Sequence, residues 1–577
     1  MEWSKNARYW LAIIVLACVV YVPGLSNSFT YLDDHVQVVE NPFVRSLNFE
    51  SIKGIFTTYF VGMYQPVTTI IYAATNTFFG MKPTAFHGLS LLLHIINSLL
   101  VFKLLRSFLK SNNLPVVLTA VFVIHPMQVE SVAWVSAFSN LLFSFFFLLA
   151  FWFYIRYKNE GNIKFWTYCL VLFILSCLSK SAAVIFPIVL FAYDYFSSAK
   201  FELKLFFQKI PFLLISLIFG IVTLLGRETA GHLSDLSAAF SSIDRVFLVS
   251  NSFLFYPIKF LLPYPLSAFY PYPELTDGHL PSLLYLSPIL LIVIALGLFK
   301  VRNKKLIIFG SFWFIITIFL VLQFVPFGNQ ITTDRYIYLP LFGLLLILGS
   351  ALQKVKESNL LVAAVIPIFI LTTTSFQRVQ IWQNDQTLWE SVIETHPTVS
   401  QAYNNLGSFA LKQNQSQQAF NYFNQAIQIQ PNYADAYSNR GNLYAQAGNS
   451  SAAIKDFDTA IRLRPHADAY FNRANEFSNL NRLNEAISDY SESIKLDPRA
   501  DSYTNRAFAY LKIQKVTLAQ QDLKKAQQIN PRYARAYFLE GIIEQNIGNK
   551  NAACSAFLKA ANLGEANARK TYNQNCN

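Results

Sequence analysis

The sequence predicts an all-α protein, in which a polytopic helical bundle in a membrane is followed by a solenoid of short helical repeats. Three observations lead to this fold class. Hydrophobic residues make up 53% of the 577 residues and charged residues only 14%, far from the balance of a soluble globular domain. Nearly all the long apolar runs lie before residue 377. Beyond residue 396, prolines recur every 33 or 34 residues, which indicates a repeat array.

About eleven apolar segments are long enough to cross the roughly 30 Å of hydrocarbon in a bilayer. The first combines a basic start with an apolar run, and no small-residue cleavage site follows it, so we expect an uncleaved signal-anchor. The expected spans begin near Tyr9, Ala85, Pro115, Ser131, Phe165, Ala182, Ile210, Pro281, Lys305, Tyr336 and Asn359.

Lysine and arginine gather in the short loops between these segments, as the positive-inside rule requires of cytoplasmic loops. If the N-terminus is inside, all of these loops fall inside and the C-terminal tail falls outside. The same distribution explains the formal net charge of +13 and argues against nucleic-acid binding. The inside residues are Lys5 and Arg8; Lys103, Arg106 and Lys110; Arg156, Lys158 and Lys164; Lys200, Lys204 and Lys209; Arg302, Lys304 and Lys305; Lys354 and Lys356.

Two further apolar segments fit a re-entrant or interfacial helix on the outer face better than a span. If residues 246–262 crossed the membrane, the basic loop at 302–305 would move outside, and this segment also contains Pro257 and Lys259. Residues 64–80 are amphipathic. We expect both segments to cover a cavity that opens outward.

The tail repeats one frame of residues five times. In each unit a tyrosine opens the first helix, an alanine lies where the second helix packs closely, and a bulky residue follows. The recurring residues are Pro397, Pro431, Pro465, Pro498 and Pro531; Tyr403, Tyr437, Tyr470, Tyr503 and Tyr537; Ala419, Ala453, Ala486, Ala519 and Ala553; Phe423, Phe457, Tyr490, Leu523 and Phe557. This pattern resembles the tetratricopeptide repeat (TPR) over about residues 398–565, with a terminal cap after the fifth unit. We therefore expect a membrane domain at 1–380, a junction at 381–397 and a repeat solenoid at 398–577.

An asparagine lies two positions after the opening tyrosine in four of the units. The first helix of such a repeat lines the concave groove, and an amide side chain offers a donor and an acceptor to an extended peptide of any sequence. We expect these residues to bind a polypeptide; the alternative is that asparagine is simply common at this position of the repeat. They are Asn405, Asn439, Asn472 and Asn505.

Six short motifs occur in order in the membrane part. They are Tyr31-Leu32-Asp33-Asp34; Tyr64-Gln65-Pro66-Val67; Phe86-His87 with His94; His125-Pro126-Met127-Gln128-Val129-Glu130; Leu178-Ser179-Lys180; and Asp334-Arg335-Tyr336-Ile337-Tyr338-Leu339-Pro340. Together they resemble the transmembrane and tetratricopeptide-repeat O-mannosyltransferase family, relatives of the protein O-mannosyltransferases. The resemblance implies a GT-C fold and a glycosyltransferase that takes a sugar from a polyprenyl phosphate at its outer face. The chain departs from the family pattern at Gln65, where arginine is usual, and at Ser181, where an acidic residue commonly follows the lysine.

The residues themselves fit this chemistry. The chain has no P-loop and no dinucleotide fingerprint, which suits a site where lipid-linked donors replace sugar nucleotides. Transfer to a Ser or Thr hydroxyl needs a general base and cations that hold the charge of the leaving phosphate. Asp33 or Asp34 is the predicted base, and the other orients the loop or the acceptor; the alternative is an aspartate pair that caps a short helix.

Three further charged residues are expected at the outer face. Lys180 and Arg335 would hold the donor phosphate, unless they are interfacial cations whose side chains snorkel to water. Glu130 is a catalytic candidate that would bind the acceptor, the sugar or a metal. A divalent cation, Mg²⁺ or Mn²⁺, at Asp34 and Glu130 is compatible with these carboxylates, although no ligand spacing is diagnostic.

Four polar residues are candidates for lining a substrate cavity. His87 and His94 lie one heptad apart on one face of a span, and His125 precedes another helix junction. Together with Gln65 they would mark a substrate path through the membrane domain. The alternative for the histidines is a ring that is hydrogen-bonded to a neighbouring helix.

We therefore expect transfer of a sugar, mannose by the resemblance, from a polyprenyl-phosphate donor to Ser or Thr of exported or lumenal proteins held by the repeats. Two alternatives stay open: the same fold acting on a lipid-linked glycan, and a non-enzymatic membrane-anchored scaffold. The compact repeats and short loops favour a bacterial inner membrane with periplasmic repeats over an endoplasmic-reticulum membrane with lumenal repeats. A Cys554–Cys576 disulfide is compatible with an extracytoplasmic tail, and free thiols equally so.

Overall fold

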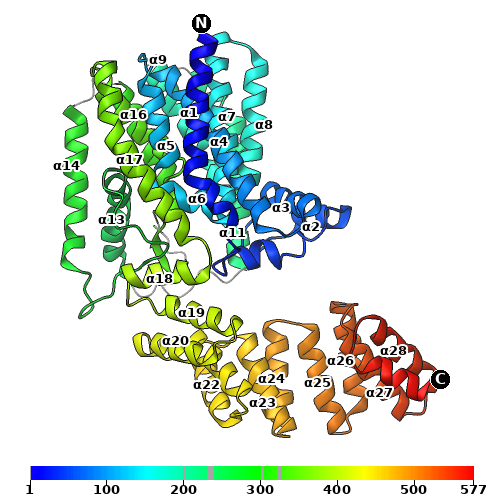
Figure 1. Ribbon diagram of the computed structural model, residues 1–577. Coiled ribbons are helices and arrows are strands. Elements are labelled where there is room, and N and C mark those ends of the chain that lie inside the picture. Colours follow the sequence, from blue (N-terminus) through cyan, green and yellow to red (C-terminus); the bar gives the residue numbers. More distant parts are fainter. Residues whose placement is uncertain are drawn as a thin grey trace. The chain divides into compact units, whose positions relative to one another are not determined.

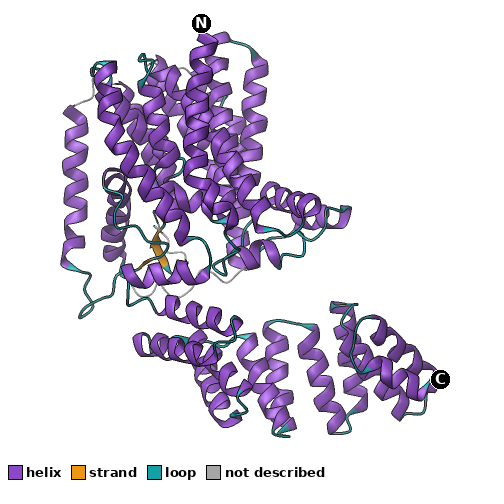
Figure 2. Ribbon diagram, in the orientation of Figure 1, coloured by secondary structure: helices purple, strands orange, loops and turns teal. Residues whose placement is uncertain are grey.

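The structure is a computed structural model that describes residues 2–198, 203–229, 240–300, 305–322, 324 and 328–576. The chain divides into two compact units, Met1–Pro397 and Thr398–Asn577. Both units are helical, and the described residues contain one small sheet, in which β1 (Tyr270–Pro271) pairs antiparallel with β2 (Gln330–Thr332) (Figure 2). The predicted all-α fold class is confirmed.

The first unit is a bundle of apolar helices that run side by side (Figure 1). Within the described residues, five helices are long and apolar enough to cross a membrane, and a sixth span results if a helix pair bent by 51° is counted as one. The five involve α1 (Glu2–Tyr21), α4 (Pro83–Phe108), α7 (Phe138–Glu160), α11 (Ile210–Thr229) and α17 (Glu357–Ile381), and the bent pair joins α5 (Leu114–Ile124) to η3 (Pro126–Gln128) and α6 (Val129–Ala133).

Shorter apolar helices occupy the positions of the other expected spans. They are α8 (Ile163–Ser179), α9 (Phe186–Ser198), α14 (Ser287–Lys300), α15 (Lys305–Phe319) and α16 (Leu341–Leu352). Each expected span is therefore an apolar helix, in the expected order. The total of eleven crossings stays a prediction, because a 12-residue helix such as α16 extends only about 18 Å at 1.5 Å per residue, less than the roughly 30 Å of a bilayer core.

The two segments expected at the outer interface are also helical. Residues 64–80 contain α3 (Pro66–Phe79), which at 14 residues extends about 21 Å. Residues 246–262 belong to α13 (Ser242–Leu261), which contains Pro257 and is not among the helices apolar enough to span. Their interfacial position stays a prediction. The remaining short helices of this unit include η1 (Val22–Ser26), η2 (His35–Val39), α2 (Phe49–Thr57), α10 (Leu203–Phe207) and α18 (Asp385–Thr395).

Two glycines allow α15 and α16 to pack at backbone contact. A Cβ atom on Gly310 would lie 2.7 Å from the carbonyl oxygen of Gly343, and a Cβ atom on Gly343 would lie 2.5 Å from the carbonyl oxygen of Gly310. Small residues serve this purpose between membrane helices, where close van der Waals packing replaces the hydrophobic effect. The contact fixes the start of α16, directly after the Asp334–Pro340 motif.

α1 and α17 run in the same direction through the bundle. Near their starts, the Tyr9 hydroxyl donates to Asn113 (3.0 Å), and Glu357 accepts a hydrogen bond in the same α4–α5 turn. Beyond their ends, the Ser28 amide donates to the carbonyl oxygen of Gln383 (2.9 Å). The loop that carries Asp33 and the segment that leaves α17 therefore share one end of the bundle.

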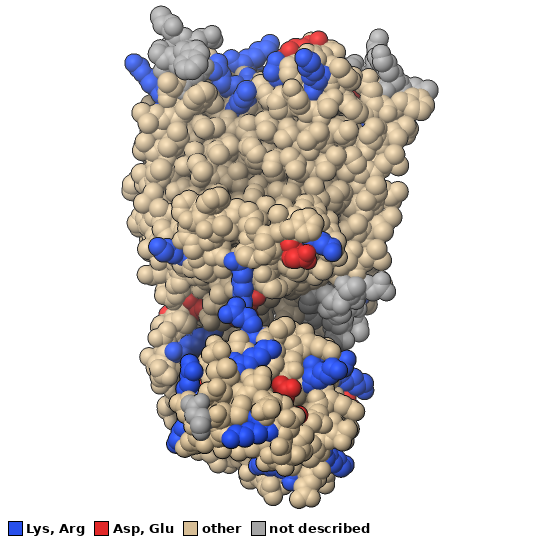
Figure 3. Space-filling model, turned by 90° about the vertical axis from the view of Figure 1, so that its right-hand side faces the viewer, with Lys and Arg blue, Asp and Glu red and all other residues tan. Residues whose placement is uncertain are grey.

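Basic side chains gather at the opposite end, where α1 begins. On the face of this unit shown in Figure 3, Lys and Arg side chains cluster at the N-terminal end above a broad band of uncharged residues. The C-terminal turns of α4 and α7 contribute Arg106 and Lys158. Arg106 and Lys158 are two of the expected inside residues; Lys200, Arg302 and Lys304 lie outside the described residues, as do the side chains of Lys5 and Lys204.

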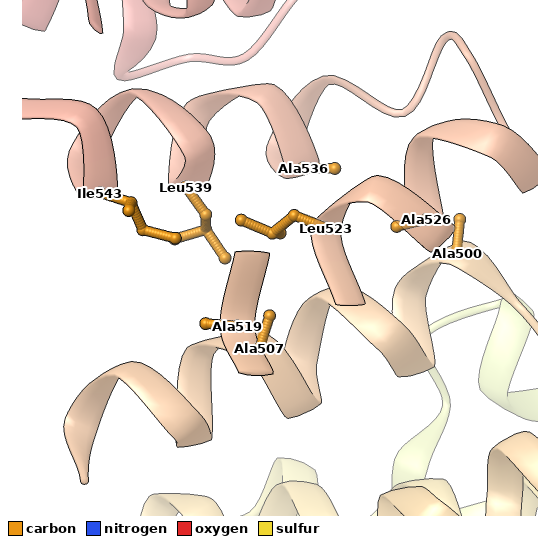
Figure 4. Close-up of a cluster of buried hydrophobic side chains, with 8 residues drawn as sticks. All are labelled: Ala500, Ala507, Ala519, Leu523, Ala526, Ala536, Leu539 and Ile543. Atoms are coloured by element: carbon orange, nitrogen blue, oxygen red, sulfur yellow. The ribbon is translucent and has the colours of Figure 1, made fainter. Parts of the chain in front are cut away.

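The second unit consists of antiparallel helix pairs in series (Figure 1). A bulky residue of each second helix packs over the first: a Cβ atom on Gly441 would lie 2.7 Å from the ring of Phe457. Neighbouring pairs share alanine-rich contacts, as in the cluster where Leu523 of α26 meets Leu539 of α27 (Figure 4). The helices are α19 (Ser400–Lys412), α20 (Ser416–Ile429), α21 (Ala434–Gln446), α22 (Ser450–Leu463), α23 (Ala467–Asn479), α24 (Leu483–Leu496), α25 (Ala500–Lys512), α26 (Val516–Ile529), α27 (Ala534–Asn546), α28 (Lys550–Asn562) and α29 (Ala568–Asn575).

A ladder of arginine–aspartate pairs joins the two helices within three successive repeats. In each repeat, the arginine that follows the groove asparagine donates two hydrogen bonds to a buried aspartate on the second helix. The pairs are Arg440–Asp456 (2.7 and 2.9 Å), Arg473–Asp489 (2.7 and 2.9 Å) and Arg506–Asp522 (2.8 and 2.8 Å). These arginines hold the repeat together.

Candidate functional site

Asp34 fastens the loop after α1 to the start of α7. Its carboxylate is buried and accepts from the amide (2.9 Å) and hydroxyl (3.1 Å) of Thr30 and from the amide (2.8 Å) and hydroxyl (2.5 Å) of Ser136. Burial raises the pKa of Asp34, and the hydrogen bonds from Ser136 and Thr30 oppose that shift. Both carboxylate oxygens are thus engaged in holding the loop.

Asp33 is the available carboxylate of the pair. It is half-buried, and no described residue donates a hydrogen bond to its carboxylate. Burial raises the pKa of Asp33 to about 6; the charge of Arg335 opposes this shift, and the charge of Asp34 adds to it. A carboxyl group with a pKa near neutrality and a free oxygen meets the requirements of a general base.

Glu130 and Arg335 form a buried ion pair beside Asp33. Arg335 donates through Nη1 to Oε1 of Glu130 (2.5 Å) and through its backbone amide to Oε2 (3.1 Å). The guanidinium lies 4.9 Å from the ring centroid of Trp134 and 5.1 Å from that of Tyr336. Glu130 therefore fixes the orientation of Arg335, while the charge of Arg335 also acts on Asp33.

A second buried ion pair joins Asp334, the residue before Arg335, to Arg378. Asp334 accepts from Nη2 of Arg378 (2.5 Å) and from the hydroxyl of Tyr270 (2.9 Å). Burial raises the pKa of Asp334, against the opposing charge of Arg378. The short helix η7 (Asp334–Ile337) is in this way tied to the last turn of α17.

Lys180 and Arg335 line one small pocket. Its walls include Asn140 and Tyr336, and the Lys180 ammonium donates to Oδ1 of Asn140 (2.6 Å). The ammonium lies 6.0 Å from the ring centroid of Tyr336. Burial, followed by the charge of Arg335, lowers the pKa of Lys180 to about 7, and Glu130 opposes that shift. Two cations from distant parts of the sequence thus converge on one hollow.

Gln65 lies at the N-terminus of α3. Its side-chain amide contacts the sulfur of Met63 at 3.1 Å. One turn later, the Thr68 hydroxyl donates to the carbonyl oxygen of Ser179 (2.9 Å), the residue before Lys180. Gln65 is therefore carried on the helix that abuts the Lys180 turn.

The three histidines lie inside the helical bundle. His94 contacts the Tyr338 hydroxyl through Nδ1 (2.8 Å) and the carbonyl oxygen of Val123 through Nε2 (3.1 Å). His125 contacts the carbonyl oxygen of Phe260 through Nε2 (3.1 Å). Both rings link neighbouring helices, as the structural alternative anticipates.

His87 differs from the other two. Its ring is buried beside the backbone of Asn27 and Ser28, and it borders a very small pocket with Tyr21 and Val379. The role of all three histidines in a substrate cavity stays a prediction.

The sequence is compatible with a divalent cation at Asp34 and Glu130, although no ligand spacing is diagnostic. Within the described residues, no group of three or more His, Cys, Asp or Glu side chains is arranged to hold a metal ion. The oxygens of both carboxylates are already engaged, in one case by Thr30 and Ser136 and in the other by Arg335. These side chains as arranged do not fit a cation site.

The groove asparagines form a chain of amide contacts across the repeats. Nδ2 of Asn439 donates to an asparagine of the preceding repeat, and Asn472 and Asn505 do the same at 2.8–3.0 Å. Asn405, in the first repeat, accepts a longer contact (3.5 Å) from its chain neighbour. All four side chains are partly exposed. Three of these asparagines therefore already donate a hydrogen bond to the preceding repeat. Peptide binding by all four stays a prediction.

Sequence reasoning missed several residues of the site. Asn140 and Ser136 lie at the start of an apolar helix, where a cluster of small polar residues was the available signal. Arg378, the partner of Asp334, is a cation at the end of an otherwise apolar span. As with Lys180, its position at a helix end was the available signal.

Known proteins are similar to this chain in its repeats and over most of its length. Residues 406–473, 467–499 and 500–533 match models of the tetratricopeptide repeat. Over 447 residues the chain is 24% identical to protein O-mannosyl-transferase F38B6.6 of Caenorhabditis elegans, covering 73% of this chain and 63% of that protein. Over 418 residues it is 23% identical to human protein O-mannosyl-transferase TMTC3, covering 63% and 44%. The chain thus spans less than two thirds of the length of these relatives.

Two solved structures match part of the chain: MamA, and TTC0263, a TPR protein of Thermus thermophilus. MamA is 22% identical, with 28% of this chain and 96% of that chain covered and a TM-score of 0.26. TTC0263 of Thermus thermophilus is 17% identical, with 30% and 98% covered and a TM-score of 0.27. At these TM-scores the likenesses support no further conclusion.

The fold and the site define a class: a helical membrane protein with a carboxylate–cation site, joined to a tetratricopeptide-repeat solenoid. Within that class, the matched relatives bear the name of the family that the motifs resemble. The chain is related to the TMTC-type protein O-mannosyl-transferases.

Proposed function

We propose that this protein is an integral-membrane glycosyltransferase that moves a sugar, expected to be mannose, from a polyprenyl phosphate to a Ser or Thr hydroxyl of an extracytoplasmic protein. The observation that carries the proposal is the free Asp33 carboxylate under the charge of Arg335, with Arg335 and Lys180 lining one pocket. A base and two cations are what such a transfer requires.

The chemistry divides among these residues. The acceptor oxygen attacks the anomeric carbon, the carbon–oxygen bond to the phosphate breaks, and the phosphate leaves with the bonding electrons. Asp33 takes the hydroxyl proton. Lys180 and Arg335 hold the charge that grows on the phosphate, which lowers the barrier most where water is excluded.

The neighbouring residues position this machinery. Asp34 fixes the loop that carries Asp33 by its four hydrogen bonds to Thr30 and Ser136. Glu130 orients Arg335, and Asn140 orients Lys180. In this account Glu130 is a positioning residue, which is narrower than the catalytic role expected from the sequence.

Two observations support an extracytoplasmic site. The loop that carries Asp33 lies at the end of the bundle opposite the basic clusters, which the positive-inside rule assigns to the cytoplasm. In the repeat unit, Cys554 and Cys576 are joined as a disulfide, with their Cα atoms 5.6 Å apart, and disulfides persist in oxidising compartments. The repeats would then bind the acceptor polypeptide in the periplasm, or in the lumen if the membrane is that of the endoplasmic reticulum.

The test is transfer by the purified full chain in liposomes, with radiolabelled polyprenyl-phosphate mannose and a Ser/Thr-rich acceptor protein. Asp33→Asn should abolish labelling of the acceptor protein. Glu40 is an exposed carboxylate six residues after Asp34, and Glu40→Gln should leave the labelling intact. Full transfer by Asp33→Asn would refute the proposed base. Label that enters a lipid-linked glycan and never the polypeptide would refute the protein acceptor.

A further inference from the structure

A groove at the basic end of the membrane unit has no part in the proposed transfer. It has a volume of about 570 Å³, within the range of about 300–1,000 Å³ that is usual for small-molecule sites. It is lined by residues of α1, α4 and α7, among them Trp10, Leu100, Lys103, Arg106 and Trp152. Lys180, Arg335 and Asp33 are not among its lining residues.

The groove has an apolar wall and a basic rim. Ile96, Leu99 and Leu100 supply aliphatic surface from successive turns of α4. Lys103 and Arg106 follow at the C-terminal end of the same helix, so the charge lies at one end of the groove. A groove with an apolar wall and cations at one end matches a molecule with a hydrocarbon tail and an anionic head.

The basic rim is well placed for an anionic head group. The Lys103 ammonium lies 4.3 Å from the ring centroid of Trp152, and within the described residues it forms no ion pair. At the same end, Arg156 is neutralised by Glu160 (2.7 Å). Trp10, near the start of α1, is 45% exposed, and exposed tryptophan near the end of a membrane helix is typical of the membrane–water interface.

We propose that this groove binds one anionic phospholipid of the leaflet that faces the N-terminal end, with its acyl chain against α4 and its phosphate at Lys103 and Arg106. Basic pockets between membrane helices on the cytoplasmic side recognise anionic head groups in this way. The site is separate from the donor site, because the two lie at opposite ends of the bundle. A bound lipid would pack α1 against α4 and α7 and stabilise the bundle.

The experiment measures lipid retention by the purified full chain, using native mass spectrometry after exchange into detergent with dioleoylphosphatidylglycerol or dioleoylphosphatidylcholine. The wild type should retain phosphatidylglycerol and not phosphatidylcholine. Lys103→Gln with Arg106→Gln should weaken retention about thirtyfold, since basic residues near a membrane surface contribute about 1 kcal/mol each. Lys110→Gln, which removes an exposed charge just beyond the same helix, should leave retention unchanged.

A second variant tests the apolar wall without altering charge. Leu100→Trp should fill the groove and reduce phosphatidylglycerol retention at least fivefold while Lys103 and Arg106 remain. The proposal is overturned if the double variant or Leu100→Trp retains phosphatidylglycerol as the wild type does, or if Lys110→Gln weakens it equally. It is also overturned if the wild type retains phosphatidylcholine equally well, or if soluble glycerol phosphate displaces the bound lipid.

Discussion

Asp34 and Ser136 are joined by two hydrogen bonds across 102 residues of chain, since one carboxylate oxygen accepts from both the amide (2.8 Å) and the hydroxyl (2.5 Å) of Ser136. This contact separates the roles of two adjacent aspartates. The carboxylate of Asp34 is consumed in fastening the loop to the bundle, whereas the carboxylate of Asp33 is left to react.

The two aspartates should therefore respond differently to the same substitution. Asp34→Asn removes an acceptor from the Thr30 and Ser136 contacts, and hydrogen bonds to a charged group are worth about 1.5–3 kcal/mol. We expect Asp34→Asn to lower the free energy of unfolding by about that amount, measured by thermal unfolding in detergent. Asp33→Asn should unfold like the wild type and be inactive. Equal destabilisation by both variants would contradict this division of roles.

Transfer should have a bell-shaped dependence on pH. Asp33 must be deprotonated to accept a proton, and its pKa is raised to about 6, so the rate should rise with pH through about 6. Lys180 must be protonated to hold the phosphate, and its pKa is lowered to about 7, so the rate should fall above about 7. The optimum should lie between these two limits.

The basic limb of that profile can be tested by itself. Lys180→Arg keeps a positive charge at all accessible pH values, so it should retain activity and extend the optimum to higher pH. Glu40→Gln should leave both limbs in place. A basic limb that is unchanged in Lys180→Arg would show that another group causes the loss at high pH.

The fold was largely predictable from the sequence because periodic signals are local. Apolar runs located each membrane helix, and the return of Pro431 and Pro465 after Pro397 located the repeats. The same local reasoning could not separate Asp33 from Asp34. That distinction depends on Ser136, whose contact with Asp34 spans 102 residues and follows from tertiary structure alone.

The charged residues of the candidate site were predictable from the sequence, but the ion pairs between them were not. Glu130 and Arg335 were both named from their motifs, but their contact with each other spans 205 residues and follows from tertiary structure alone. The arginines of the repeats show the same limit. Arg473 follows a groove asparagine, and only the fold reveals that it turns away to Asp489.

The Glu130–Arg335 pair should be costly to break. Glu130 is 1% exposed and Arg335 17% exposed as side chains, and removing one partner of a buried ion pair costs about 3–5 kcal/mol, because a charge is left uncompensated. We expect this loss in Glu130→Ala by thermal unfolding. The Glu130→Ala, Arg335→Ala double variant should be less destabilised than the sum of the two single variants.

An exposed pair in the same unit serves as the matched comparison. Arg156 and Glu160 are 39% and 45% exposed, and surface ion pairs contribute only about 0–1 kcal/mol. Glu160→Ala should therefore unfold nearly like the wild type. If Glu130→Ala and Glu160→Ala lowered the free energy of unfolding equally little, Glu130 would not be the rigid support of Arg335 that we infer.

The repeat unit offers an internal comparison at Arg473, which contacts two aspartates of different exposure. Asp489 accepts two hydrogen bonds and is 9% exposed, whereas Asp458 accepts one and is 53% exposed. Asp489→Asn should lower local stability by about 1.5–3 kcal/mol, because a buried charge-assisted pair is weakened, and Asp458→Asn by about 0.5 kcal/mol or less. Hydrogen exchange of α23 and α24 in the full chain measures both. Faster exchange in Asp458→Asn than in Asp489→Asn would contradict the inference that the buried contacts of the arginine–aspartate ladder hold each helix pair together.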